Sequence, residues 1–115
     1  MPRERLPDRR PSLLTDLHHD GSRYDLCVGF KTSGEAGEVF ITGSKSGSHM
    51  DGLLSDIGVL LSRLLQHGDG VEELATGMGR LGSGEAPASI VGAILDRVAS
   101  ETAKNAKRGS AKEGG

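Results

Sequence analysis

Residues 20–42 have the sequence DGSRYDLCVGFKTSGEAGEVFIT, and this stretch decides the fold. It begins with Asp20-Gly21, a dipeptide typical of the two-residue turn of a β-hairpin. Residues 23–30 then alternate between polar and apolar side chains. Such a period of two predicts a half-buried strand, whose buried face consists of Tyr24, Leu26, Val28 and Phe30.

Two further strands flank this one. Residues 14–18 precede the hairpin turn and form a short candidate strand, and residues 38–42 follow a Gly-rich turn at 33–37. Three strands that are joined by two tight turns predict an antiparallel meander.

After the strands, the apolar period lengthens to three and four. It predicts a long helix that is capped by Ser48 and stopped by Gly68, with one wide apolar face made of Met50, Leu53, Leu54, Ile57, Leu60, Leu61, Leu64 and Leu65. A shorter helix is expected from residues 69–70 to near Gly77, and a last helix carries Pro87 in its first turn. We therefore predict an α+β fold, in which two to three helices pack on one face of a small antiparallel three-stranded sheet.

Positive charge is concentrated at the two ends of the chain. Residues 1–12 hold four arginines and two acids, a net charge of +2, and residues 104–115 hold four basic residues and one acid, a net charge of +3. Because the whole chain has a net charge of −2, residues 13–103 carry −7. We expect a basic arm at 1–12, an α+β domain at 13–103 and a disordered basic tail at 104–115.

Composition argues against several classes of function. The nearly balanced charge and an aromatic content of 3% disfavour a nucleic-acid-binding surface. No apolar run reaches the length of a membrane span and no secretion signal is recognised, so we expect a cytoplasmic domain with no membrane contact. The single Cys27 and the scattered histidines predict neither a metal site nor a cofactor, and no set of nucleophile, base and orienting residue predicts a catalytic centre.

The best local candidate for a binding site is the loop between the third strand and the long helix. It contains Gly43, Ser44, Lys45, Gly47 and Ser48. Glycines let the backbone approach an anion, a helix start offers free N–H groups, and Lys45 adds a positive charge. These residues predict a phosphate-binding loop, although their spacing is not that of a P-loop, and a simple strand-to-helix connection is the alternative.

Taken together, the chain resembles the TSCPD domain, which occurs at the C-terminal end of adenosylcobalamin-dependent (class II) ribonucleotide reductases and in small stand-alone proteins. The matching blocks follow in order: residues 5–10 (RLPDRR), 24–29 (YDLCVG), 37–41 (GEVFI), 45–48 (KSGS), 52–54 (GLL), 62–68 (SRLLQHG), 73–74 (EL), and 89–91 (SIV) with Ile94. The family is named for a Thr-Ser-Cys-Pro-Asp motif, whereas the corresponding residues 86–91 read APASIV. Any redox or metal role of the motif's Cys and Asp is therefore not expected here.

The resemblance implies an appendage of ribonucleoside-diphosphate reductase and not its catalytic unit, because a 115-residue chain with one cysteine cannot hold the reductase's barrel, reducing cysteine pair and cobalamin site. The leading hypothesis is a non-catalytic accessory or regulatory domain of deoxyribonucleotide synthesis that docks on a reductase or on another copy of itself. The alternative is a small nucleotide or phosphate sensor that uses the Gly43–Ser48 loop, and an independent enzyme is the reading favoured least.

Overall fold

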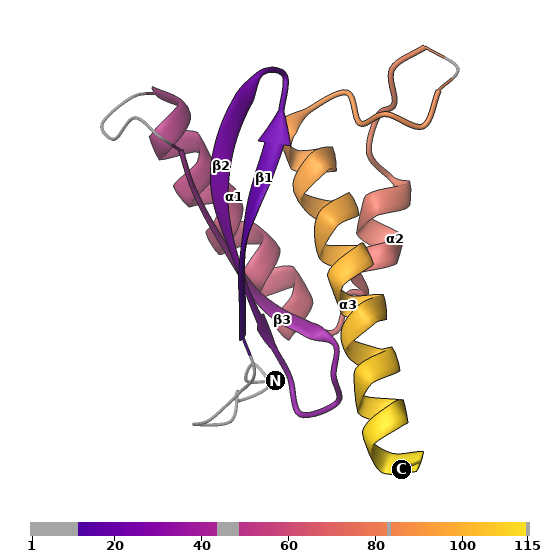
Figure 1. The fold of residues 1–115 in the computed structure, drawn as a ribbon. Helices are drawn as coiled ribbons and strands as arrows, with labels where there is room; N and C mark the ends of the chain where they lie inside the picture. The colour runs from indigo at the N-terminus through magenta and orange to yellow at the C-terminus, as the bar shows by residue number, and fades with distance from the viewer. Residues whose placement is uncertain (1–11, 44–48, 83, 115) are drawn as a thin grey trace.

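The computed structural model describes residues 12–43, 49–82 and 84–114, with side chains described as far as Asn105. A three-stranded antiparallel sheet in the order β1-β2-β3 is followed by three helices (Figure 1). The elements are β1 (Ser12–His19), β2 (Ser22–Phe30), β3 (Ala36–Gly43), α1 (His49–Gln66), α2 (Val71–Thr76) and α3 (Ile90–Gly114). The α+β class and the meander that the sequence predicts are confirmed.

The turn between β1 and β2 has the geometry that its sequence predicts. Asp20 and Gly21 both have positive φ, 49° and 79°, as a type I′ hairpin turn requires at its two central residues. The strands then pair in continuous register from His19 opposite Ser22 to Ser12 opposite Gly29. This register places Tyr24, Leu26, Val28 and Phe30 on the buried face, as expected.

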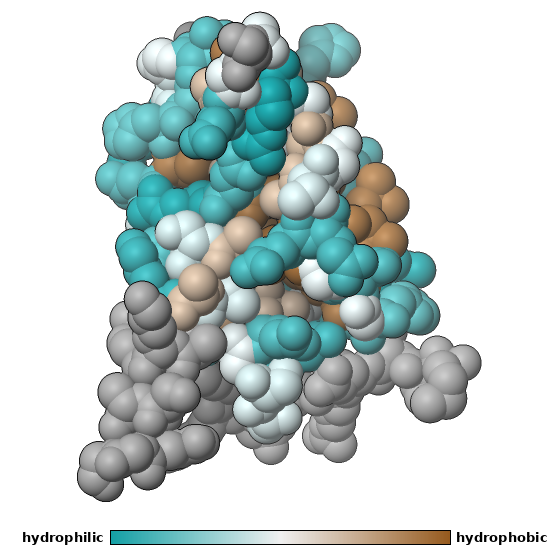
Figure 2. Space-filling view, turned by 90° about the vertical axis from the view of Figure 1, so that its right-hand side faces the viewer, coloured by the Kyte–Doolittle hydropathy of each residue, from teal (hydrophilic) through white to brown (hydrophobic). Residues whose placement is uncertain are grey.

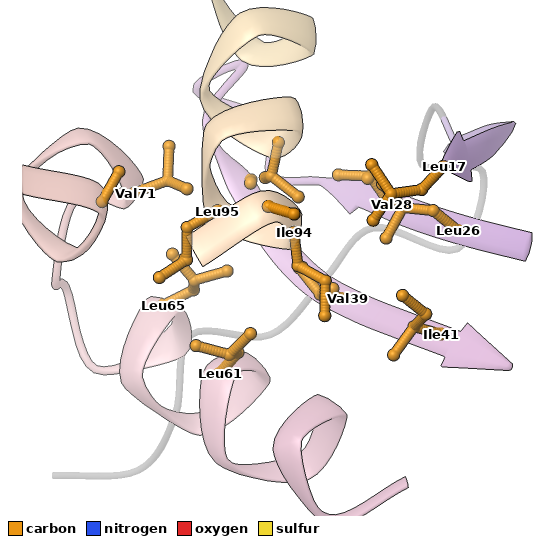
Figure 3. Packing of buried hydrophobic residues seen from close by; sticks show 14 of the residues in the cluster. Leu17, Leu26, Val28, Val39, Ile41, Leu61, Leu65, Val71, Ile94 and Leu95 are labelled. Carbon is orange, nitrogen blue, oxygen red and sulfur yellow. The ribbon is translucent and has the colours of Figure 1, made fainter. Parts of the chain in front are cut away.

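The core lies between this face of the sheet and the helices. Six side chains of the sheet and α3 are fully buried: Leu26, Val28, Val39, Ile94, Leu95 and Val98. Helix α1 adds Leu61 and Leu65 to the same cluster (Figure 3). α2 closes the end of this layer with Val71 and Ala75. Each buried leucine, isoleucine or valine contributes roughly 1.5–3 kcal/mol of transfer free energy relative to full exposure.

Helix α1 follows the free edge of β3. Ser62 donates through Oγ to the carbonyl of Val39 at 3.1 Å and accepts from the Val39 N–H at 2.9 Å, and Gln66 donates to the carbonyl of Gly37 at 3.0 Å. One turn earlier, a Cβ on Gly58 would stand 3.1 Å from the Val39 oxygen. Because these three residues follow one another at a spacing of four, they lie along one side of the helix, next to the edge of the sheet. They cover backbone polar groups of β3 that have no neighbouring strand to pair with.

The apolar residues of α1 do not form one wide buried face. Leu54, Leu61 and Leu65 are buried, whereas Met50, Leu53, Leu60 and Leu64 are exposed and Ile57 is partly buried. The core therefore uses only part of the wide apolar face that the sequence predicts for this helix. The cause is the side of α1 that carries Gly58, Ser62 and Gln66, which lies against the edge of β3. Because this side faces the strand, half of the apolar residues of the helix point away from the core.

The start and the end of α3 both differ from the sequence prediction. α3 begins at Ile90 and not at Pro87: the Ser89 Oγ accepts from the Gly92 N–H at 3.2 Å and caps the helix, while Pro87 pairs with Arg80 in an isolated β-bridge. The α3 backbone extends to Gly114, over most of the segment for which a disordered tail is predicted. Alanine and lysine, frequent in that segment, are good helix formers. The division into arm, domain and tail stays a prediction.

Candidate functional site

The predicted phosphate-binding loop lies mostly outside the described residues. β3 ends at Gly43 and α1 begins at His49, as the prediction requires. Gly43 itself packs beside Tyr24 and Leu54. Ser44, Lys45, Gly47 and Ser48 are not among the residues that the structure describes, so the anion site stays a prediction.

A row of non-polar side chains crosses the face of the sheet that is turned away from the helices. Leu14 pairs with Cys27 and Cys27 pairs with Phe40 in the strand register. Their strand neighbours Leu26, Val28 and Val39 point into the core, so this row, the open-face row, points outward. Leu14 is 75% and Phe40 52% exposed, and Cys27 is intermediate.

Phe40 is the unusual member of the open-face row. The chain has three aromatic residues, and the other two, Tyr24 and Phe30, are buried in the core. Although it lies at the centre of an edge strand and opposite Cys27, Phe40 leaves about half of its surface exposed to solvent. Aromatic residues, phenylalanine included, are enriched at protein interfaces relative to the rest of the protein surface.

A charged cluster lies beside the open-face row. Asp16 follows Leu14 by two residues on β1, whereas Asp25 and Arg23 precede Cys27 by two and four residues on β2. Arg23 contacts Asp16 at 3.1 Å and Asp25 at 3.3 Å. The hydrogen bond from Arg23 and then its charge lower the pKa of the Asp16 carboxyl, and the same bond raises the pKa of Arg23. An apolar row bordered by exposed charges matches the layout of a docking interface, which has an apolar centre and a polar rim.

Cys27 has no activating neighbours in the open-face row. Its cross-strand partners are Leu14 and Phe40, whereas a reactive thiolate is stabilised by a cation, a histidine or a helix N-terminus. The arrangement therefore fits Cys27 as a small contact residue. Within the described part of the chain, no three His, Cys, Asp or Glu side chains gather in a way that could hold a metal ion.

A surface pocket of about 270 Å³ lies where the β2–β3 turn, the start of α2 and α3 meet. Its lining is mainly acidic, with Glu35, Asp69, Glu72 and Glu73 around the buried Lys31. These carboxylates are exposed to solvent, so they do not define a fixed set of hydrogen bonds for one ligand. We therefore regard the open-face row as the better candidate site.

The loop before α3 is anchored by Arg80, a residue that is not among the candidates predicted from the sequence. Its guanidinium forms a bidentate ion pair with Asp96 of α3, at 2.5 and 2.9 Å, and donates to the carbonyls of Ala75 and Glu85, both at 3.0 Å. The hydrogen bond from Arg80 lowers the pKa of Asp96. No sequence signal links two residues 16 positions apart, although an arginine within a Gly-rich loop is a hint of such an anchor.

Large apolar side chains reach the surface at several places in the described part of the chain. Figure 2 shows a largely hydrophilic face on which hydrophobic side chains come to the surface, most clearly at the right-hand edge. Among the described residues, the large apolar side chains that are exposed are Leu14, Phe40, Met50, Leu53, Val59, Leu60, Leu64 and Leu81. No helix in the described ranges combines the length and the apolar character that crossing a membrane requires.

Comparison with known proteins gives two matches of interest. A family model described as "TSCPD domain" matches residues 3–101. The vitamin B12-dependent ribonucleotide reductase of Rhodopirellula baltica (strain DSM 10527 / NCIMB 13988 / SH1) is 44% identical over 66 residues, which are 57% of this chain and 6% of that protein. The match thus covers a small fraction of the relative's length. No solved structure matches the chain.

Proposed function

The chain belongs to the TSCPD domain family, and from this premise we propose that it is a non-catalytic accessory or regulatory module of deoxyribonucleotide synthesis. It acts by docking on a ribonucleotide reductase. We place this role in the cytoplasm, as expected from the sequence.

The similarity to a B12-dependent ribonucleotide reductase supports the link to this enzyme. The aligned 66 residues are 6% of the reductase, so the shared part is too short to contain a complete catalytic machinery. A module of this size contributes to a large enzyme by contact, either as a covalent part of it or as a separate chain.

The observation that carries the docking role is the exposure of Phe40 in the open-face row. A docking surface needs an apolar centre that loses its water on binding, and Phe40 with Leu14 supplies one opposite the helices. The cluster of Arg23, Asp16 and Asp25 beside it supplies charges that fix the orientation of the partner.

The experiment measures binding of the full chain to the B12-dependent ribonucleotide reductase of the same cell by biolayer interferometry. We expect Phe40→Ser to weaken binding by about thirtyfold, the effect of losing an interface residue worth about 2 kcal/mol. Leu81→Ser is the matched control, since Leu81 is 58% exposed and lies in the loop before α3. It should leave binding unchanged.

Two results would overturn the proposal. One is the absence of any binding by the wild-type chain to the intact reductase. The other is an equal loss in the Phe40→Ser and Leu81→Ser variants, because it would mean that the open-face row has no particular part in the contact.

A further inference from the structure

Helix α1 carries a second apolar surface besides its core-facing leucines. Met50, Leu53, Ile57, Leu60 and Leu64, here called the outer stripe, follow one another at spacings of three, four, three and four. All except the partly buried Ile57 are between 40% and 62% exposed. The alternation of three and four over a helix is the pattern by which one helix packs along another in a coiled coil.

Charged residues border the outer stripe on one side. Asp56 and Arg63 directly precede Ile57 and Leu64, lie seven residues apart and are exposed. Neither forms an ion pair or side-chain hydrogen bond with the other described residues. On the other side, the stripe adjoins the buried Leu54 and Leu61. The bordering charges are thus of opposite sign and one heptad apart.

We propose that α1 pairs antiparallel with α1 of a second copy of this chain through the outer stripe. In the antiparallel arrangement of a heptad seam, Ile57 packs against the partner's Leu60, and Leu53 against the partner's Leu64. That register brings Asp56 next to the partner's Arg63. The two-fold axis repeats the same pair between Arg63 and the partner's Asp56, as an isologous interface requires.

Charge complementarity selects this occupant and this direction. A parallel pair would set Asp56 against the partner's Leu61, so that neither exposed charge would face an opposite charge on the partner's α1. In the antiparallel pair each exposed charge on the border of the stripe meets its opposite, and the two contacts fix the register.

The position of the rest of the domain is compatible with this direction. The C-terminal half of α1 faces α3, since Leu65 lies near Leu95 (Figure 3). The N-terminal half lies beside the end of β3, where a Cβ on Gly43 would stand 3.7 Å from a methyl carbon of Leu54. In an antiparallel pair, α3 and the partner's α3 therefore lie toward opposite ends of the helix pair. The interface does not use the open-face row and is independent of the proposed docking on a reductase.

Sedimentation velocity of the full chain at high micromolar concentration tests the proposal. We expect a dimer for the wild type and a monomer for Leu60→Glu, which puts two carboxylates into the apolar seam. Val59→Glu is the matched control: Val59 is also exposed on α1, but it lies about 160° around the helix from Ile57. This variant should remain dimeric, and circular dichroism should show that both variants are folded.

A charge exchange tests the direction and the register. Asp56→Arg alone and Arg63→Asp alone each turn two attractive contacts into repulsive ones and should raise the dimer dissociation constant about tenfold. The double variant Asp56→Arg/Arg63→Asp restores both contacts and should return the constant to the wild-type value.

A monomeric wild type, a dimeric Leu60→Glu, or a double variant no better than the single ones would overturn the antiparallel pair. The reductase-docking proposal has a separate readout, because Phe40→Ser should leave the dimer intact. Failure of one proposal is therefore distinguishable from failure of the other.

Discussion

Ser62 and Val39 exchange two hydrogen bonds, so that one side chain of α1 satisfies both backbone groups of a residue on the free edge of the sheet. The hydroxyl accepts from the Val39 N–H at 2.9 Å and donates to the Val39 carbonyl at 3.1 Å, and all these atoms are buried. An edge strand normally offers such groups to another strand. Here the helix takes the place of that strand.

Removal of the Ser62 hydroxyl should therefore destabilise the domain. We expect Ser62→Ala to lower the free energy of unfolding by about 1–3 kcal/mol, because it leaves a buried donor and a buried acceptor without a partner. Ser55→Ala, at an exposed position of the same helix, should change it by less than about 0.5 kcal/mol. Urea denaturation measures both values, and equal effects would contradict the role given to Ser62.

The two glycines of α1 should respond in different ways to the same substitution. A Cβ on Gly52 meets nothing within 4 Å, whereas a Cβ on Gly58 stands 3.1 Å from the Val39 oxygen. Gly52→Ala should raise the free energy of unfolding by up to about 1 kcal/mol, through the better helix propensity of alanine. Gly58→Ala should lack this gain, since the edge strand must move to admit the methyl group. Thermal unfolding of the two variants decides the matter: an equal gain would show that α1 does not need glycine at position 58.

The local parts of this fold could be predicted from the sequence. Asp20-Gly21 predicts its hairpin because the turn type depends on two residues alone, and both have the positive φ that it needs. Gly68 predicts the end of α1, and its φ of 106° and the bond from Asp69 N–H to the Leu64 carbonyl form the expected C-terminal cap. In these cases the information lies within one turn of chain.

The contacts that hold the elements together could not be predicted in this way. Ser62 and Val39 are 23 residues apart, and nothing near either residue indicates the other. Periodicity showed that α1 is apolar over a wide arc but not which part faces the core, since that depends on where the edge of β3 lies. The candidate site shows the same limit. The sequence predicts a strand over residues 38–42, but the exposure of Phe40 follows from the helices covering only the other face of the sheet.

The ion pair between Arg80 and Asp96 should make stability depend on pH in the acid range. Because Arg80 holds the pKa of Asp96 below its usual value, the carboxylate contributes stability above the unfolded-state pKa of about 3.9 and loses it as the pH falls through the lower folded-state pKa. Asp96→Asn should therefore have a lower urea midpoint than the wild type at pH 7, and the difference should shrink below about pH 4.

Glu72→Gln provides the control for this pH dependence, since Glu72 is an exposed carboxylate on α2. The urea midpoint of this variant should differ little from that of the wild type at pH 7 and at pH 3. A wild-type advantage over Asp96→Asn that stays constant between pH 7 and pH 3 would mean that the charge of Asp96 does not stabilise the loop before α3.

A nucleotide sensor built on Gly43, Ser44, Lys45, Gly47 and Ser48 is the rival of the docking module, and the two make opposite predictions for ligand-induced stabilisation. A ligand at a hundred times its dissociation constant stabilises a protein by roughly 2.7 kcal/mol, a readily visible rise of the melting temperature. The docking module predicts no such rise with ribonucleotides, deoxynucleotides or inorganic phosphate at fixed salt. A rise with one nucleotide that disappears in Lys45→Ala, but persists in Lys104→Ala as a control for loss of positive charge, would favour the sensor. Docking through Phe40 uses the face of the sheet that is turned away from the helices, so a nucleotide site would not exclude it. The binding experiment with the reductase would then decide whether the chain has both properties or acts as a sensor alone.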